Sequence, residues 1–323
     1  GYLAWVVHHL GVDDMSWTIL ADDLRVACAQ LARGSAASLP SEGTTVAAWH
    51  HGLRNYACSE QGAEEATWWR SMLEPFADDV GDVSGLSPRA TTQKRAGTRV
   101  AMTPAQTREW FETLTGRHRI QVRDAVFTAI GGALCRASGR DAVVVHVEGH
   151  GREPTIVQAD LHRTVGWFTS LYPLVLRASK PGESPIEAMR RTGRTLDAVP
   201  HGGVGYGALR YGSPDVAVRR ALTAPAVDVC INYLGGRLAR KRADAAPTKA
   251  PSDRTSAPSP LMRGLAIAVD EQPGYALQIS IGIVGEAFVV EMLHDPSPEH
   301  THSARRLADD ILSAVRALAG GDL

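Results

Sequence analysis

The sequence predicts an α/β protein of the α+β kind, with a mixed sheet, because two apolar patterns occur along its 323 residues. Short runs rich in β-branched residues, such as 141–147 and 226–234, predict buried strands. Other segments carry apolar residues at helical spacing, and these segments do not alternate regularly with the strands. The apolar fraction of 44% is ordinary for a globular protein and is enough for a sizeable core.

The chain opens on an apolar run, residues 2–7, which predicts a buried strand that ends at His8 and His9. Ser16 is the predicted N-cap of the following helix, and Gly34 is its predicted stop. One face of this helix carries the apolar residues Leu20, Leu24, Ala27 and Leu31.

The remaining elements follow from the same two patterns. Helices are expected over 45–58, 63–76, 104–115, 121–138, within 181–199 and from 303 to 320, the last with Leu307, Ile311, Val315 and Leu318 on one face. Strands are expected over 98–103, 141–147, 165–178 and 226–234, and a hairpin over 276–284 and 286–293. Residues 77–97 are expected to form a long polar connection, and residues 238–263, rich in Ala, Pro, Ser and basic residues, a flexible excursion.

Charge, cysteine usage and the length of the apolar runs indicate which partners and which cellular compartment to expect. The formal net charge is −1, and acids and bases are interspersed along the chain. A protein that binds nucleic acid needs a clustered basic face, so we expect no nucleic-acid partner. Four scattered cysteines without a CxxC pair predict free thiols in a reducing compartment, and therefore a cytoplasmic protein. No apolar run reaches 18 residues and the first residues lack a signal-peptide pattern, so we expect no association with a membrane.

Two short segments contain residues that could transfer protons. His8 and His9 precede Asp13 and a predicted helix N-terminus, where an imidazole can exchange protons and the helix dipole can favour an oxyanion. The alternative is that one His packs while the other faces solvent. The pair does not have the spacing of a helical zinc site, and no HExxH motif occurs, so no metal site is expected.

The second segment is VEGHGREP, residues 147–154, in which Glu148 leaves a predicted strand and could act as a base. Gly149 and Gly151 would let the backbone approach a substrate closely. The alternative is a structural turn whose acids pair with Arg152 or Arg163.

Three further motifs have simple structural interpretations. The Gly-rich segment 201–212 lacks GK[ST], so it is not a phosphate-binding loop. The segment NYLGG, 232–236, is typical of a strand end with a turn, and WFTSLYP, 167–173, predicts core aromatic residues.

Taken in order, HHLGVDDMSW, VEGHGRE, RTVGWFTSLYPLVL, PHGGVGYGALRYG and INYLGG resemble the motif series of epimerization domains of nonribosomal peptide synthetases. These domains belong to the condensation-domain superfamily, and the resemblance extends from residue 1 to about residue 318. The EGHGRE and RTVGWFTSLYP motifs distinguish epimerization domains from the condensing members, which share mainly the HHxxxDG element.

The resemblance implies a chloramphenicol-acetyltransferase-like fold of two lobes with a tunnel between them. Members of the family carry a substantial segment before HHxxxD, so the resemblance implies a truncated N-terminal lobe. Residues 1–60 would be its remnant, and residues 61–323 the C-terminal lobe. The opening strand would then lose neighbouring strands and expose apolar surface.

The resemblance also implies inversion of the Cα stereocentre of an aminoacyl or peptidyl thioester. The substrate would arrive on the 4'-phosphopantetheine arm of an upstream peptidyl carrier protein domain, within a larger synthetase, and no tightly bound cofactor is implied. Glu148 and His9 match the family's proton-transfer residues. We expect Glu148 to be the main base and His9 to stabilise or protonate the enolate.

Supporting roles are carried over from the same motifs. The helix start after Ser16 would stabilise the oxyanion, Asn232 and Tyr233 would line the pocket, and Asp13 would orient its loop through Arg152. Asp14 replaces the family's Gly after the motif Asp, and Gly236 replaces a Gln. Two alternatives stay open. One is a condensation domain, against which EGHGRE counts, and the other is an inactive carrier-docking fragment, which Asp14 and the truncated lobe motivate.

Overall fold

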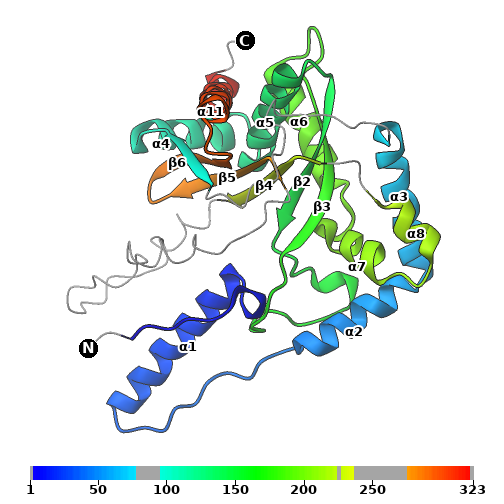
Figure 1. Cartoon of the computed structure of the whole chain (residues 1–323). Coiled ribbons are helices and arrows are strands. Elements are labelled where there is room, and N and C mark those ends of the chain that lie inside the picture. The colour runs from blue at the N-terminus through cyan, green and yellow to red at the C-terminus, as the bar shows by residue number, and fades with distance from the viewer. Residues whose placement is uncertain (1–2, 78–94, 224–226, 236–274, 321–323) are drawn as a thin grey trace. The chain divides into compact units, whose positions relative to one another are not determined.

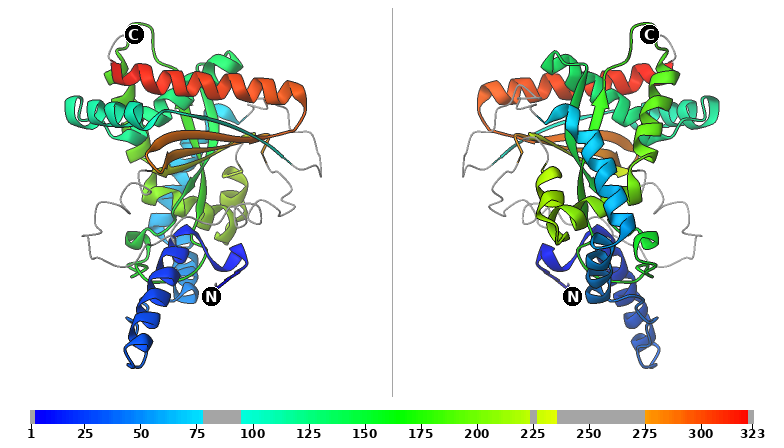
Figure 2. Two further views of the ribbon diagram at one scale, coloured as in Figure 1. Left: turned by 90° about the vertical axis from the view of Figure 1, so that its left-hand side faces the viewer. Right: turned by 90° about the vertical axis from the view of Figure 1, so that its right-hand side faces the viewer.

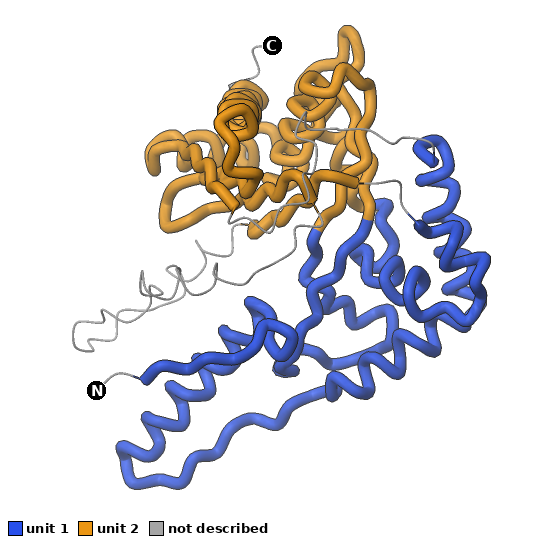
Figure 3. Tube along the Cα trace, in the orientation of Figure 1, with its two compact units in different colours: residues 1–78, 148–172, 198–225 blue, residues 79–147, 173–197, 226–323 orange. Residues whose placement is uncertain are grey.

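Figure 1 shows the computed structural model of the chain, which describes residues 3–77, 95–223, 227–235 and 275–320. Three features of the sequence lie outside the described residues: the expected excursion at 238–263, Gly236, and most of the expected connection at 77–97. Contacts divide the chain into two compact units, each built from separate segments (Figure 3). Unit 1 comprises residues 1–78, 148–172 and 198–225, and unit 2 comprises 79–147, 173–197 and 226–323. The lobe boundary expected near residue 60 stays a prediction.

A six-stranded mixed sheet, with strand order β1-β6-β5-β4-β2-β3, lies mainly in unit 2. Its strands are β1 Ala96–Ala101, β2 Ala142–Gly149, β3 Ser170–Arg177, β4 Val229–Gly235, β5 Leu277–Val284 and β6 Ala287–His294. Strand β6 pairs antiparallel with β1 and β5, whereas β4 pairs parallel with β5. The predicted mixed α/β class and the predicted hairpin are therefore confirmed.

Four longer helices belong to unit 2, and the packing of the last of them can be followed in Figure 2. They are α4 Pro104–Glu112, α5 Val122–Ser138, α6 Pro185–Asp197 and α11 Pro298–Gly320, and the five-residue turn η3 Thr113–Arg117 follows α4. Helix α11 contacts α5, β1 and β6, and its predicted apolar face is buried. It begins five residues before its predicted start, because the Ser297 hydroxyl accepts a hydrogen bond from the His300 amide and caps the helix there.

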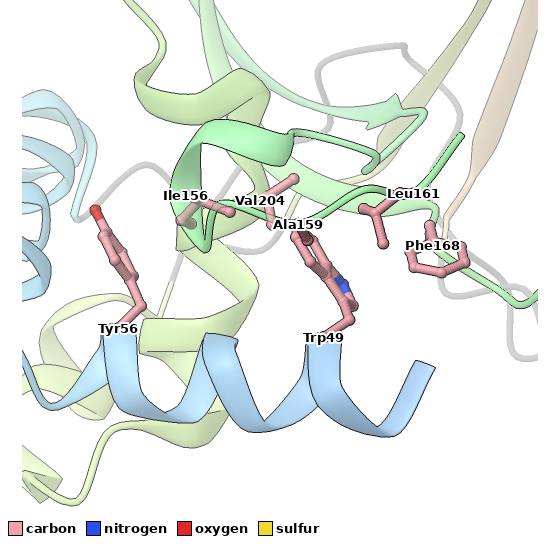
Figure 4. Close-up of a cluster of buried hydrophobic side chains, with 7 residues drawn as sticks. All are labelled: Trp49, Tyr56, Ile156, Ala159, Leu161, Phe168 and Val204. Atoms are coloured by element: carbon pink, nitrogen blue, oxygen red, sulfur yellow. The ribbon is translucent and has the colours of Figure 1, made fainter. Parts of the chain in front are cut away.

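Unit 1 is mainly helical and has its own apolar core (Figure 4). Its helices are α1 Asp14–Ala32, α2 Val46–Ala57, α3 Glu60–Leu73, α7 Val204–Gly212 and α8 Val216–Ala221, with the short turns η1 His9–Gly11, η2 Glu74–Phe76, η4 Pro154–Ile156 and η5 Pro200–Gly203. Helix α2 supplies Trp49 and Tyr56, two turns apart on one face. They pack with Ile156, Ala159, Leu161, Phe168 and Val204.

The predicted strand at residues 2–7 is wrong for the residues that are described. Residues 3–8 have no strand conformation, and Leu3, Trp5 and Val6 are exposed. A strand needs a hydrogen-bonding neighbour, and an apolar run alone does not supply one. The strand predicted over 165–178 is likewise shorter, because β3 begins at Ser170.

The four cysteines are free, as predicted: Cys28 and Cys58 are exposed, whereas Cys135 and Cys230 are buried. None of the helices in the described part of the chain has the length and apolar character required to cross a membrane.

Candidate functional site

A buried ion pair between Asp13 and Arg152 forms the centre of the candidate site, and both residues belong to unit 1. Arg152 is only 8% exposed, and its Nη2 donates to the two Asp13 carboxylate oxygens at 2.9 and 3.0 Å. Its Nη1 donates to the carbonyl oxygens of Leu161 at 2.9 Å and Thr164 at 2.7 Å. The guanidinium also lies over the Phe168 ring, 4.1 Å from its centroid. The predicted contact of Asp13 with Arg152 is confirmed.

Asp13, and not the predicted Ser16, is the N-cap of α1. The backbone of Asp13 is extended, and its carboxylate accepts a hydrogen bond from the Ser16 amide at 2.7 Å. Burial alone would raise the pKa of this carboxyl. The hydrogen bonds from Arg152 and Ser16 outweigh burial, so the pKa of Asp13 is lower than its ordinary value. Asp13 is therefore held as a carboxylate that orients its surroundings.

Ser16 is fully buried and belongs to this ion-pair cluster. Its hydroxyl lies 2.8 Å from an Asp13 oxygen and 2.9 Å from the Gly166 carbonyl oxygen, and it accepts from the Gly166 amide at 3.0 Å. Because its own amide is bonded to Asp13, the Ser16 amide is not a free donor. Ser16 therefore has a structural role in the cluster, and the expected oxyanion support by the helix start after it stays a prediction.

The cluster joins three segments that are far apart in the sequence. Asp13 belongs to the HHLGVDD segment, Arg152 to VEGHGRE, and Gly166 and Phe168 to VGWF. The Asp13 amide donates to the Gly166 carbonyl at 3.1 Å, and the Phe168 amide donates to the Asp13 carboxylate at 3.4 Å. Gly151 has a φ of 66°, and a Cβ atom there would lie 1.5 Å from the Phe168 carbonyl oxygen. Only glycine allows this approach.

The two histidines have different surroundings. The His8 Nδ1 accepts a hydrogen bond from the Leu10 amide at 3.1 Å, so His8 caps the short turn η1. The His9 ring instead packs against the Trp167 ring, with 5.5 Å between centroids. Trp167 is 43% exposed, whereas Phe168 is buried, so the predicted core role of WFTSLYP holds for Phe168 and not for Trp167.

Trp167 is the site residue that sequence reasoning missed. Aromatic character alone predicts burial, and only the order of the motifs could have placed Trp167 near His9. The contact orients the His9 imidazole from one side, through the VGWF segment that Asp13 also holds.

Glu148 is the penultimate residue of β2 and is half-buried. The turn after it is fixed by His150, whose Nδ1 accepts from the Arg152 amide at 3.0 Å and whose Nε2 lies 3.2 Å from a Glu153 carboxylate oxygen. Gly149 is closely surrounded, since a Cβ atom there would lie 2.6 Å from the Ser170 hydroxyl. The backbone that follows Glu148 is therefore held by the contacts of Gly149 and His150.

Asn232 and Tyr233 lie on β4, in unit 2. The Tyr233 ring packs edge-on against Phe127 of α5, 6.0 Å between centroids, and burial raises the pKa of its phenol to about 12. Successive residues of a strand point to opposite faces, so Asn232 lies on the face away from α5. The expectation that both residues line a pocket stays a prediction. In the described part of the chain, no group of three His, Cys, Asp or Glu side chains could hold a metal ion.

Comparison with known proteins adds to this geometry. The Condensation domain family matches residues 1–319 of the chain. A linear gramicidin synthase protein of Brevibacillus parabrevis is 32% identical over 324 residues, which cover 98% of this chain and 4% of that protein. A chondramide synthase of Chondromyces crocatus is 36% identical over 238 residues, which cover 72% of this chain and 6% of that protein. The chain therefore spans a small part of these relatives.

Solved structures show the same fold. The epimerization domain from the third module of tyrocidine synthetase B superimposes with a TM-score of 0.77 at 23% identity, covering 97% of this chain and 68% of that one. The first condensation domain of the calcium-dependent antibiotic synthetase superimposes with a TM-score of 0.64 at 18% identity, covering 97% and 63%.

Proposed function

The chain belongs to the condensation-domain family, and from this premise we propose that it inverts the Cα stereocentre of an aminoacyl or peptidyl thioester from L to D. The substrate is delivered on the 4'-phosphopantetheine arm of an upstream peptidyl carrier protein domain. The carrier and the rest of a synthetase are the partners in this proposal.

The Asp13–Arg152 pair is the observation that carries the proposal. His9 precedes Asp13 by four residues, and Glu148 precedes Arg152 by four residues. The pair therefore holds the two segments that carry the proposed proton-transfer groups, although Asp13 and Arg152 are 139 positions apart in the sequence. Proton abstraction next to a thioester carbonyl needs such groups held in place, because positioning supplies much of the rate.

The proposed reaction is a proton exchange with no change of oxidation state. The Glu148 carboxylate removes the Cα proton, and the C–H electron pair is delocalised into the thioester carbonyl as an enolate. The His9 imidazolium returns a proton to the opposite face of Cα. Protonated Glu148 and neutral His9 then exchange protons with water, which restores the starting state.

Exchange of the Cα proton into deuterated water tests this assignment, with an aminoacyl thioester on a carrier domain as substrate. We expect Glu148→Gln to lower the exchange rate by at least about 100-fold, because a positioned base contributes about 10² to 10⁴. Glu291→Gln is the matched control, since Glu291 is an exposed strand residue on β6. Full exchange in Glu148→Gln would refute the assignment of the base.

Condensation is the second candidate function, because a condensation domain shares the fold. Chiral chromatography of the carrier-bound product separates the candidates. A mixture of D and L product supports epimerization, an amide product supports condensation, and carrier binding with neither product supports the docking fragment.

A further inference from the structure

Glu65 of α3 is a buried carboxylate in unit 1 that the proposed reaction does not use. It is 4% exposed, and its two oxygens accept hydrogen bonds from the Trp69 indole at 2.8 Å and from the Tyr56 hydroxyl. Burial raises the pKa of the Tyr56 phenol, which keeps it a neutral donor. The carboxylate also lies against α7, because a Cβ atom on Gly205 would be 2.2 Å from the nearer Glu65 oxygen. Such a group is costly to bury unless it is fully bonded.

His201 is the side chain that faces this carboxyl group. Its Nε2 lies 4.0 Å from a Glu65 oxygen, and its ring stands edge-on to Tyr56, 5.6 Å between centroids. His201 has a φ of 45°, and the next two residues, Gly202 and Gly203, have φ values of 56° and 82°. Three consecutive left-handed residues are unusual, and a non-glycine residue among them needs support from its surroundings.

This left-handed loop, residues 201–203, lies against the end of β2. The Gly202 carbonyl oxygen would be 3.2 Å from a Cβ atom on Gly149, the residue after Glu148. A Cβ atom on Gly203 would lie 2.0 Å from the Tyr172 ring, and Tyr172 in turn borders Gly149. A shift of the loop would therefore move the backbone beside Glu148.

We propose that Glu65 and His201 are positioning residues for Glu148. The buried carboxylate holds the His201 imidazole, His201 holds the left-handed loop, and the loop fixes the backbone at Gly149. Neither residue touches the reacting atoms. The catalytic part of this inference rests on the proposed epimerization, whereas its structural part concerns the loop and can be tested without activity.

Four variants test the proposal. Glu65→Gln keeps the shape of the side chain and replaces its carboxyl group by an amide, and Glu64→Gln makes the same change at the exposed neighbouring residue of α3. His201→Asn removes the imidazole but keeps a residue that tolerates left-handed backbone. The fourth variant combines Glu65→Gln with His201→Asn.

The first measurement is hydrogen–deuterium exchange of backbone amides, followed by mass spectrometry of the intact chain. We expect Glu65→Gln and His201→Asn to speed amide exchange in peptides covering 199–206 and 146–154, with no change elsewhere, and Glu64→Gln to leave both peptides unchanged. Amide exchange that rises throughout the chain would overturn the proposal, because Glu65 would then stabilise unit 1 as a whole. Unchanged exchange in both peptides would also overturn it, because Glu65 would then not act on the loop.

The second measurement is the rate of Cα proton exchange. We expect Glu65→Gln and His201→Asn each to lower kcat by about 10-fold to 100-fold, the loss expected from a small misplacement of a reacting group, with KM for the carrier-bound substrate unchanged. The double variant should be no slower than the slower single variant, because both changes act on one loop. If the unaltered chain shows no Cα exchange, the proposed function fails, while amide exchange still decides the positioning role.

Discussion

At the scale of single residues, the Asp13–Arg152 pair has a large desolvation cost, because both side chains are buried. Its hydrogen bonds to Ser16 and to the carbonyl oxygens of Leu161 and Thr164 offset that cost. Loss of one partner would leave the other charge buried and uncompensated.

We therefore expect Asp13→Asn to lower the free energy of unfolding by about 3 to 5 kcal/mol, the range for breaking a buried ion pair by removing one partner. Denaturant titration at neutral pH measures this change. The control is Asp23→Asn, which breaks the part-exposed pair of Asp23 with Arg163 and should cost less than about 1 kcal/mol. Equal losses of unfolding free energy in the two variants would show that burial does not make the Asp13–Arg152 pair more important for stability than the Asp23–Arg163 pair.

The pH dependence of this difference follows from the lowered pKa of Asp13. A carboxyl whose pKa is lower in the folded state stabilises the protein above its ordinary pKa of 3.8 and loses that contribution as pH falls through the lowered value. The gap in unfolding free energy between the unaltered chain and Asp13→Asn should therefore be constant near neutral pH and shrink as the pH falls from 3.8 through the lowered pKa of Asp13. Denaturant titrations across this pH range measure the gap, and a gap that widens in acid would contradict the assignment.

At the scale of elements, the turn after β2 depends on a glycine for two separable reasons. Gly151 has a left-handed φ of 66° and also lies against the Phe168 carbonyl. Gly139, which ends α5, has a similar φ of 69°, but nothing lies within 4 Å of where its Cβ would be.

We expect Gly139→Ala to lower the free energy of unfolding by about 1 to 2 kcal/mol, the cost of left-handed backbone for an L-residue. Gly151→Ala should cost clearly more, because the turn must also move away from Phe168. Thermal and denaturant unfolding of both variants measure the difference. Equal losses would mean that the turn relaxes freely and does not fix the segment that carries Arg152.

Periodic apolar patterns correctly predicted the helices and strands whose apolar residues pack against apolar residues of adjacent elements. The β5–β6 hairpin and the face of α11 follow from residues that are buried against one another in unit 2. The run at residues 2–7 is also apolar, but its described residues pair with no strand. The predicted start of β3 was early because the amides of Gly166 and Phe168 donate to Ser16 and Asp13 and not to a neighbouring strand. Composition predicts burial, whereas pairing depends on distant contacts.

At the scale of the whole molecule, the candidate site is a set of long-range contacts. Spacing alone could not have joined Asp13 to Arg152, and the order of the motifs was the signal that did so. The exposure of Trp167 and the burial of Glu65 required the structure, because both depart from the usual preference of their residue types.

Among the residues that the structure describes, the exposed large apolar side chains are concentrated between residues 3 and 39. Eight large apolar side chains between residues 3 and 39 are exposed: Leu3, Trp5, Val6, Leu10, Leu24, Val26, Leu31 and Leu39. Two residues of the predicted apolar face of α1 are among them, with Leu24 37% and Leu31 60% exposed, whereas Leu20 and Ala27 are half-buried. A net charge of only −1 supplies little repulsion between molecules, so we expect this surface to favour self-association.

We expect the double substitution Leu24→Glu with Leu31→Glu to reduce self-association without lowering the free energy of unfolding, because neither side chain is in the core. The double substitution changes the formal net charge from −1 to −3, so its control must carry the same charge. Tyr211→Glu with Val216→Glu meets that need, since both residues are exposed on α7 and α8. Sedimentation velocity at several concentrations should show fewer oligomers for the α1 variant than for the control. Equal suppression in both would assign the association to net charge, and its persistence in both would place the associating surface elsewhere.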